Sequence, residues 1–210
     1  MHISEGVLSA PVLLAGAAVA AGGVAYGLKR MDGEGTVSAA LVTSAFFVAS
    51  LIHLNIGPAS VHLVLNGLVG LVLGWAAFPA IFTGLLLQAL LFQYGGLTTL
   101  GVNTVVMAAP AVAVSLILGP LVSRSGRVGL AASFGCGFLA VFISSLLLAA
   151  SLVFTGENFT VIAWASVVGN APVMVVEGLF TAFVASFLLR VYPELLGGLM
   201  SPSDGRKEGR

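Results

Sequence analysis

The sequence has 210 residues, of which 59% are hydrophobic and 8% are charged, and its formal net charge is zero. A water-soluble domain of this size cannot carry so much apolar surface, so the composition excludes a soluble domain and indicates an integral membrane protein. The sequence contains no large block of like charges, which excludes a nucleic-acid partner.

Apolar stretches separated by Gly, Pro or charged residues indicate about seven transmembrane helices, since a bilayer crossing needs roughly 20 mostly apolar residues. In chain order, we expect these helices at 7–26, 37–52, 60–75, 79–92, 103–122, 129–154 and 161–189. The third and fourth stretches are short, so an alternative with five full crossings and one re-entrant hairpin stays open. The predicted fold class is an all-α integral membrane protein.

The positive charges give this fold an orientation. All eight Lys and Arg residues follow the first, fifth or seventh predicted helix. With seven helices these positions share one side, and the positive-inside rule then places the N-terminus outside and the C-terminus in the cytoplasm. We therefore expect a multi-pass protein of the cell membrane. Residues 1–193 would form one membrane domain, and residues 194–210 a short cytoplasmic tail.

Two features of the apolar stretches have a structural explanation. Gly67, Gly70 and Gly74 line one predicted helix at a spacing that permits a neighbouring helix to approach closely. Cys136 stands in an apolar run and is the one cysteine of the sequence, so it is expected to be a small buried hydrophobic residue.

The three histidines of the sequence suggest a metal site, because the predicted topology places His2, His53 and His62 at the outer side. The N-terminus lacks the positively charged start of a secretory signal, so Met1 is expected to remain. Its terminal amine, the amide nitrogen of residue 2 and the His2 imidazole can then chelate one ion. A loop histidine would complete a planar set of four nitrogens, which suits Ni²⁺ and is attainable for Co²⁺. His62 is the first choice and His53 the competitor; an exposed His2 without a role is the alternative.

Several polar residues could support such a site. Glu177 is the one acid predicted well inside a helix, where it needs a partner in the bundle, and a functional and a structural role are equally open. Glu5 could orient the chelating residues, although a first-turn helix acid is the simpler interpretation. Asn103 is interpreted as a helix N-cap after a Gly-Gly turn. For Gln88 and Gln93, hydrogen bonding between helices is favoured.

Four sequence blocks resemble one known family. MHISEG, GPASVH, LLQALLFQYGGLTTLGVN and PVMVVEGLFTAFVASFL followed by YPELL are similar, in order and over nearly the whole chain, to the cobalt/nickel substrate-specific subunits of energy-coupling factor transporters, the CbiM/NikM family.

The resemblance implies seven helices, an outer N-terminus threaded into the bundle, and a metal held by the Met1 amine, both His2 nitrogens and His62. It also implies that the loop before Asn103 helps to close the site. Leu63 and Val64 follow the loop histidine where many members carry Pro or Ala and a Gly-rich stretch. Asn170 stands where some members carry another His, so the choice between the two metals stays open.

The function implied is the capture of Co²⁺ or Ni²⁺, as used in cobalamin synthesis, for an ATP-driven importer. The sequence has no G-x-x-x-x-G-K-[ST] phosphate loop. It is therefore expected to be no enzyme and to bind no permanent cofactor, the metal ion being its cargo. The resemblance implies three kinds of partner: a transmembrane coupling subunit, cytoplasmic ATPase subunits and a small accessory membrane subunit.

Two other functions would require sequence patterns of their own. A stand-alone secondary transporter or channel would be expected to show inverted repeats or several charges within the membrane. An intramembrane metalloenzyme would need a ligand cluster such as H-E-x-x-H together with a general base. The sequence shows none of these patterns.

Overall fold

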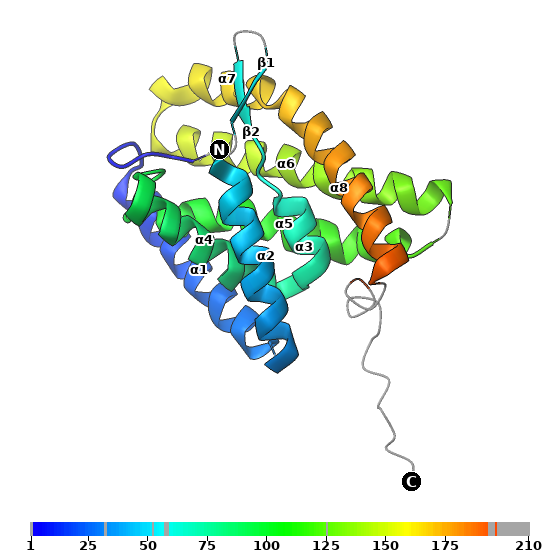
Figure 1. Ribbon diagram of the computed structural model, residues 1–210. Coiled ribbons are helices and arrows are strands. Elements are labelled where there is room, and N and C mark those ends of the chain that lie inside the picture. The colour runs from blue at the N-terminus through cyan, green and yellow to red at the C-terminus, as the bar shows by residue number, and fades with distance from the viewer. Residues whose placement is uncertain are drawn as a thin grey trace.

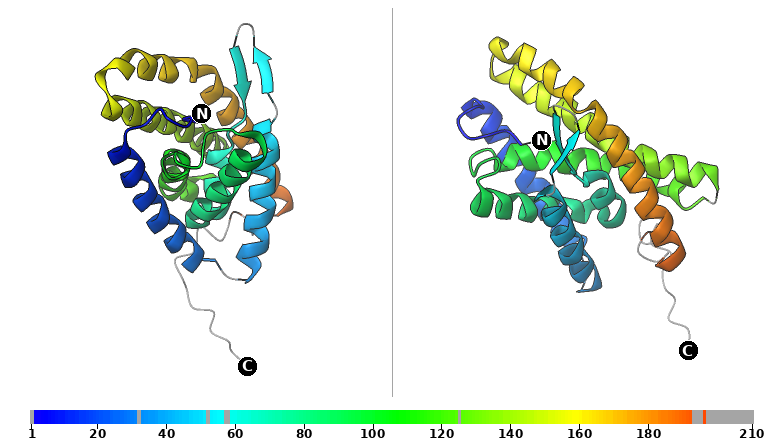
Figure 2. Two further views of the ribbon diagram at one scale, coloured as in Figure 1. Left: turned by 90° about the vertical axis from the view of Figure 1, so that its left-hand side faces the viewer. Right: turned by 45° about the horizontal axis from the view of Figure 1, so that its top comes forward.

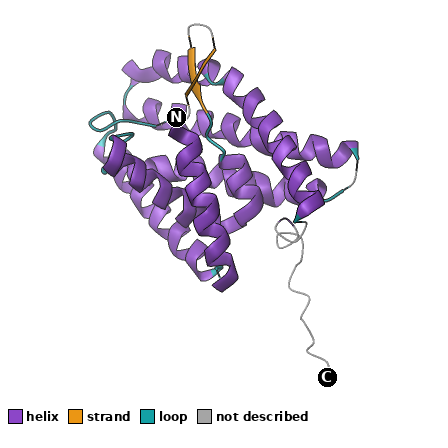
Figure 3. Cartoon of the chain, in the orientation of Figure 1, coloured by secondary structure: helices purple, strands orange, loops and turns teal. Residues whose placement is uncertain are grey.

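The computed structural model describes residues 2–31, 33–51, 53–56, 59–124, 126–192 and 196. Helices make up nearly all of this part of the chain, and two short strands form a hairpin (Figure 1, Figure 3). In chain order the elements are α1 Ala10–Lys29, α2 Gly33–Leu51, β1 His53–Ile56, β2 Ala59–His62, α3 Asn66–Leu73, η1 Gly74–Ala76, α4 Ala77–Phe92, α5 Leu100–Val122, α6 Arg127–Thr155, η2 Glu157–Phe159, α7 Thr160–Gly169 and α8 Ala171–Val191.

The helices confirm a multi-pass membrane protein. Five helical segments are long and apolar enough to cross a bilayer: Ala10–Lys29, Asn66–Phe92, Leu100–Val122, Arg127–Thr155 and Thr160–Val191. A shorter apolar helix covers Gly35–Leu51. Many large hydrophobic side chains are exposed along these helices, among them Leu14, Ile117 and Phe183, as expected where the surrounding solvent is lipid.

The core of the bundle lies around α5, which packs against α1, α3, α4 and α6. The α3 helix fits into this core because glycine removes the side chain at two contacts. A Cβ at Gly67 would lie 2.5 Å from the carbonyl oxygen of Cys136, and one at Gly70 would overlap the backbone of Ala111. The predicted close helix approach is confirmed at these two positions, while Gly74 instead marks a break, with φ of 53°.

The predicted third and fourth helices differ most from the structure. Residues 59–62 form β2, residues 63–65 are irregular, and α3 is only 8 residues long. In β1 and β2, His53 pairs with His62 and Ile56 with Ala59 in an antiparallel register. The Gly-Pro sequence at 57–58 favours a turn over a continuous helix. The hairpin is therefore an addition to the predicted all-α class.

The directions of α3 and α4 follow from their contacts. Asn66, at the start of α3, bonds to residues in the middle of α5 and α6. Trp75, in η1, packs edge-on against Tyr26 near the end of α1, with ring centroids 4.7 Å apart. Near the end of α4, Gln88 reaches His2. The α3 helix therefore runs from the bundle interior toward the end of α1, and α4 returns to the end where the N-terminal segment lies (Figure 2).

The last predicted helix is divided into α7 and α8 at Asn170. Pro172 stands in the first turn of α8, where its missing N–H costs little. In the interior of one continuous helix the same proline would remove a hydrogen bond and break the helix. The N-terminal segment and the hairpin lie at one end of the molecule, and the final turns of α1 and α8 lie toward the opposite end (Figure 1).

Candidate metal centre

The described residues contain one of the predicted metal donors in full, His2. Met1 lies outside the described residues, as do the side chains of His53 and His62, whose strands are described by their backbone pairing. Among the described residues, no group of three or more His, Cys, Asp or Glu side chains is placed to hold a metal ion. The ligand set of Met1, His2 and His62 therefore stays a prediction, and its supporting residues can be described.

Asn103 holds the N-terminal segment against α5. Its Oδ1 accepts a hydrogen bond of 3.0 Å from the backbone N–H of Ile3, and its Nδ2 donates one of 3.1 Å to the Ile3 carbonyl. Thr99 Oγ1 donates to the same carbonyl at 2.9 Å. Ile3 and Asn103 are both buried. The predicted N-cap role of Asn103 is wrong, because α5 begins at Leu100 and the Asn103 amide pairs with Ile3 instead.

Glu5 fastens the same segment to the loop that precedes α5. Its Oε1 accepts the backbone N–H of Thr98 at 3.0 Å, and its Oε2 accepts the Thr98 hydroxyl. These bonds favour the ionised carboxylate, and they lower the pKa of Glu5 below its ordinary value, the Thr98 hydroxyl being the largest cause. Glu5 precedes α1, which begins at Ala10, so its alternative interpretation as a first-turn acid is wrong.

Gln88 contacts His2 directly. The His2 Nε2 and the Gln88 Oε1 are 2.8 Å apart, and Gln88 Nε2 donates to the hydroxyl of Ser50 at 2.7 Å. Gln88 is fully buried and Ser50 nearly so. The bond to Ser50 confirms the predicted link between helices, here α4 and α2. The contact with His2 was missed, although a glutamine within the run LLLQALLF is a signal that could have found it.

Glu177 binds the backbone that follows the hairpin. Its carboxylate accepts the N–H of Leu65 at 2.9 Å and 3.0 Å, one distance to each oxygen, and also the N–H of Val64. Glu177 is fully buried, and Leu65 adopts a left-handed conformation with φ of 54°. The carboxylate thus holds the residues two and three positions after His62 and satisfies amides that precede α3.

Asn66 continues this anchor into the core. Its Nδ2 donates to the Met107 carbonyl at 3.2 Å and to the Ser144 hydroxyl at 2.9 Å. Asn66 is fully buried, so these bonds tie the start of α3 to both α5 and α6. Neither Asn66 nor Ser144 was singled out from the sequence, because their partners are 41 and 78 positions away along the chain.

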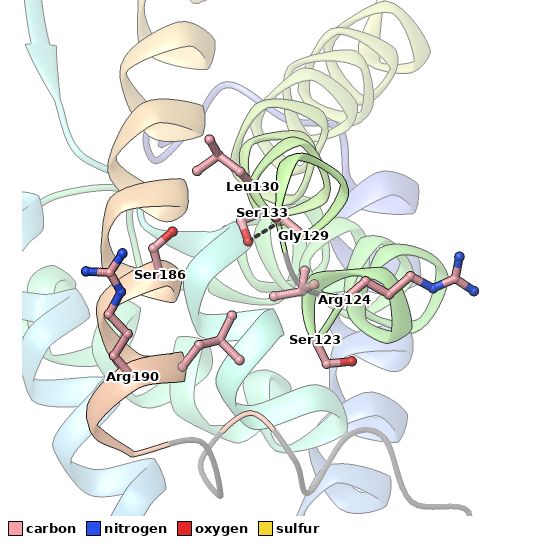
Figure 4. Close-up of a pocket in the computed structure, with 10 residues that line it drawn as sticks. Ser123, Arg124, Gly129, Leu130, Ser133, Ser186 and Arg190 are labelled. Atoms are coloured by element: carbon pink, nitrogen blue, oxygen red, sulfur yellow. Dashed lines mark hydrogen bonds between the residues drawn. The ribbon is translucent and has the colours of Figure 1, made fainter.

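Two cavities lie near opposite ends of the bundle. One of about 440 Å³ is lined by His2, Ser4, Ser166 and Asn170, among others, so Asn170 and His2 face one space. Another, of about 720 Å³, lies between the end of α5, the start of α6 and the end of α8. There the side chains of Arg124 and Arg190 extend away from each other (Figure 4). The first cavity is the one that adjoins the candidate metal centre.

Comparisons with known proteins agree with the sequence pattern. A family model described as the CbiM cobalt uptake substrate-specific transmembrane region matches residues 2–195. A protein of Haemophilus influenzae, named provisionally as a metal transport protein, is 41% identical over 206 residues, covering 93% of this chain and 97% of that protein. The cobalt transport protein CbiM of Kyrpidia tusciae is 30% identical, covering 99% and 91%. A crystal structure of a transition metal transporter shares the fold, with a TM-score of 0.77 at 23% identity and complete coverage of both chains.

Proposed function

This chain belongs to the CbiM family, and from that membership we propose that it is the substrate-capturing membrane subunit of an ATP-driven importer of Co²⁺ or Ni²⁺. The ion would be bound by the Met1 amine, the amide and imidazole nitrogens of His2, and the imidazole of His62. No resident cofactor is needed for this role, because the metal ion is the cargo.

The observation that carries this proposal is the fixed position of the N-terminal segment. The first residues of most domains are poorly ordered unless something ties them down. Here Ile3 is bonded through both its N–H and its carbonyl, and His2 is bonded through its ring. A chelate that combines a terminal amine with a distant loop histidine gains affinity from such a fixed start, since ordering a frayed terminus would cost entropy each time an ion bound.

The hairpin carries both candidates for the fourth nitrogen. His62 ends β2, and Glu177 anchors the backbone two and three residues further on. In the register of the hairpin, His62 is paired with His53. Both histidines thus remain candidates by position, and the resemblance favours His62.

The direction of α4 supports seven crossings of the membrane, with 63–73 and 77–92 as the third and fourth. The N-terminal segment would then lie outside, and the ends of α1, α5 and α8, where Lys29, Arg124 and Arg190 stand, would lie in the cytoplasm. Residues 1–193 would form the membrane domain, with 194–210 as its cytoplasmic tail.

ATP hydrolysis would be performed by separate cytoplasmic subunits that act through a transmembrane coupling subunit, with a small accessory membrane subunit beside it. The alternative, a stand-alone secondary transporter or channel, requires ionisable groups along the path of the ion. Among the described residues, Glu177 is the one buried acid, and its carboxylate is engaged by backbone amides. That arrangement favours the subunit over the stand-alone transporter.

The test of the proposal is the metal content and affinity of the purified protein for Ni²⁺ and Co²⁺. The informative variants are His2→Ala and a chain extended before Met1 by the five residues Met-Lys-Ser-Gly-Ser, which keeps every side chain but converts the Met1 amine into an amide. We expect about one ion per chain in the unaltered protein and loss of that ion in both variants. His62→Ala and His53→Ala form a matched pair, of which only the first should lose the ion. Stoichiometric binding in both N-terminal variants would overturn the proposed site.

A further inference from the structure

A chain of hydrogen bonds leads from α2 to the ring of His2. The Ser50 Oγ lies 2.6 Å from the carbonyl oxygen of Phe47. Two oxygens this close require a proton between them, and a backbone carbonyl has none to give. The single hydroxyl proton of Ser50 therefore points to Phe47, and the Ser50 oxygen is left as an acceptor for its next neighbour.

That neighbour is Gln88, and the acceptor at Ser50 fixes which way its amide faces. The Gln88 Nε2 donates to Ser50 Oγ at 2.7 Å, so the Oε1 faces His2 Nε2, 2.8 Å away. The reverse orientation would place two acceptors against each other at Ser50. Because Oε1 has no proton to donate, the bond to His2 requires a hydrogen on Nε2 of the ring.

We propose that Gln88 is a positioning residue that holds His2 in the tautomer with its proton on Nε2 and its lone pair on Nδ1. This inference rests on the proposed function, in which the His2 ring is a metal donor. Ser50, itself held by Phe47, sets the polarity of the chain of bonds.

The consequence for the metal follows from ring sizes. The terminal amine and the amide nitrogen of residue 2 close a five-membered ring with one ion. The same amide nitrogen closes a six-membered ring through Cα, Cβ, Cγ and Nδ1 of His2, whereas Nε2 lies on the far side of the imidazole. Nδ1 is therefore the ring nitrogen that the planar chelate uses. A hydrogen-bond partner on the opposite ring nitrogen is the usual way in which proteins orient a metal-binding histidine.

The burial of Gln88 and Ser50 strengthens the preference for this His2 tautomer. Gln88 is fully buried and Ser50 is 5% exposed, so bulk water cannot replace either partner freely. The ring of Tyr94 also lies near His2, with centroids 6.3 Å apart, and limits the space in which the imidazole can turn. Leaving a buried amide oxygen unpaired is costly, so a flipped ring tautomer would be disfavoured even before an ion arrives.

The test uses two matched pairs of variants in the full-length protein. Gln88→Glu keeps an acceptor for the Nε2 proton, although the Ser50 hydroxyl must then turn from Phe47 to donate to the carboxylate, and Gln88→Met removes the acceptor at similar size. Ser50→Thr keeps the hydroxyl, and Ser50→Val removes it at the same shape. Ni²⁺ titration gives the affinity. Nitrogen NMR of ¹⁵N-histidine-labelled protein without metal, with the His2 signal identified through His2→Ala, gives the tautomer.

We expect Gln88→Met and Ser50→Val to show a mixture of His2 tautomers and to bind Ni²⁺ about 10- to 100-fold more weakly, the usual range for partners of metal-binding side chains. Gln88→Glu and Ser50→Thr should keep the Nε2-protonated form and most of the affinity. A purely structural Gln88 would change the thermal stability of all variants without changing the tautomer. Unchanged tautomer and affinity in Gln88→Met would overturn the proposal. An unaltered protein that binds no Ni²⁺ or Co²⁺ would instead overturn the proposed function, and the tautomer measurement would still decide the role of Gln88.

Discussion

Two segments would bring the metal donors together, and they are held in different ways. The N-terminal segment, residues 2–5, is fastened by several side chains: Gln88, Asn103, Thr99 and Thr98 each contribute bonds. The segment that follows the hairpin, residues 63–66, depends on Glu177 and on the side chain of Asn66 itself. The first attachment is spread over several side chains and reaches the surface at Glu5, whereas the second rests mainly on two buried side chains, Glu177 and Asn66.

The two kinds of attachment predict different effects of substitution. Losing one bond of a distributed attachment leaves the others in place, so single substitutions in the N-terminal segment should be tolerated and affect mainly binding. Losing the buried carboxylate leaves two amides without a partner in a region that water does not reach. Damage there should affect the stability of the whole fold.

The largest effect is expected for Glu177→Ala. Two buried N–H groups, those of Val64 and Leu65, would lose their acceptor, at about 1–3 kcal/mol each. Thermal unfolding in detergent, followed by circular dichroism, should show a marked loss of stability. Glu177→Gln keeps one acceptor oxygen, so its thermal stability should lie between those of the alanine variant and the unaltered protein. An alanine variant as stable as the unaltered protein would remove the distinction between the two segments.

The second largest effect is expected in the α3 helix, which continues directly from residues 63–65. Gly70→Ala would push a methyl group into the backbone of Ala111, and such overpacking costs about 1–3 kcal/mol. Gly22→Ala in α1 is the control, since nothing lies within 4 Å of the added atom. The same thermal measurement should show a loss for the first variant only. Equal stability of both would mean that α3 can move in the bundle.

Substitution of Asn103 should act on binding more than on folding. Asn103→Leu keeps the volume but removes both bonds to Ile3, each worth about 0.5–1.5 kcal/mol net. Ni²⁺ affinity should fall by roughly one to two orders of magnitude, while Thr99 still holds the Ile3 carbonyl. Hydrogen exchange at the Ile3 amide should rise in parallel. If Asn103→Leu lowers the thermal stability but leaves the exchange rate of the Ile3 amide unchanged, the N-terminal segment is part of the structural core.

The smallest effect is expected at Glu5, because its carboxylate is exposed. Its pKa is lowered in the folded protein, so its contribution is complete above the ordinary pKa of glutamate and is lost as the pH falls through the lowered value. Hydrogen exchange at the Thr98 amide, corrected for the intrinsic rate, should therefore increase at acid pH. Glu5→Gln should show the faster exchange at neutral pH and little further change. If the exchange of the Thr98 amide still depends on pH in Glu5→Gln, another titrating group causes that dependence.

The sequence predicted the apolar helices well, because a bilayer crossing is a local property of about 20 residues. It failed at 60–65, where an apolar run is compatible with either a helix or a strand and the outcome depends on Glu177, 113 positions from Val64. His2 could be proposed as a metal donor because such a chelate depends only on its sequence neighbours, and this stays a prediction. Gln88 and Ser50 could not be assigned to it, since a contact across 86 positions leaves no local trace.

The long separation between Glu177 and its partners has a consequence for biosynthesis. Val64 and Leu65 emerge from the ribosome more than a hundred residues before the acid that binds them. Until α8 has been inserted, those two amides must be satisfied by water or by the insertion machinery. The segment that follows His62, the proposed fourth nitrogen donor, would thus be among the last parts of the chain to reach its final position. A nascent chain released before α8 would carry helices α1 to α7 but would lack the acid that completes its interior.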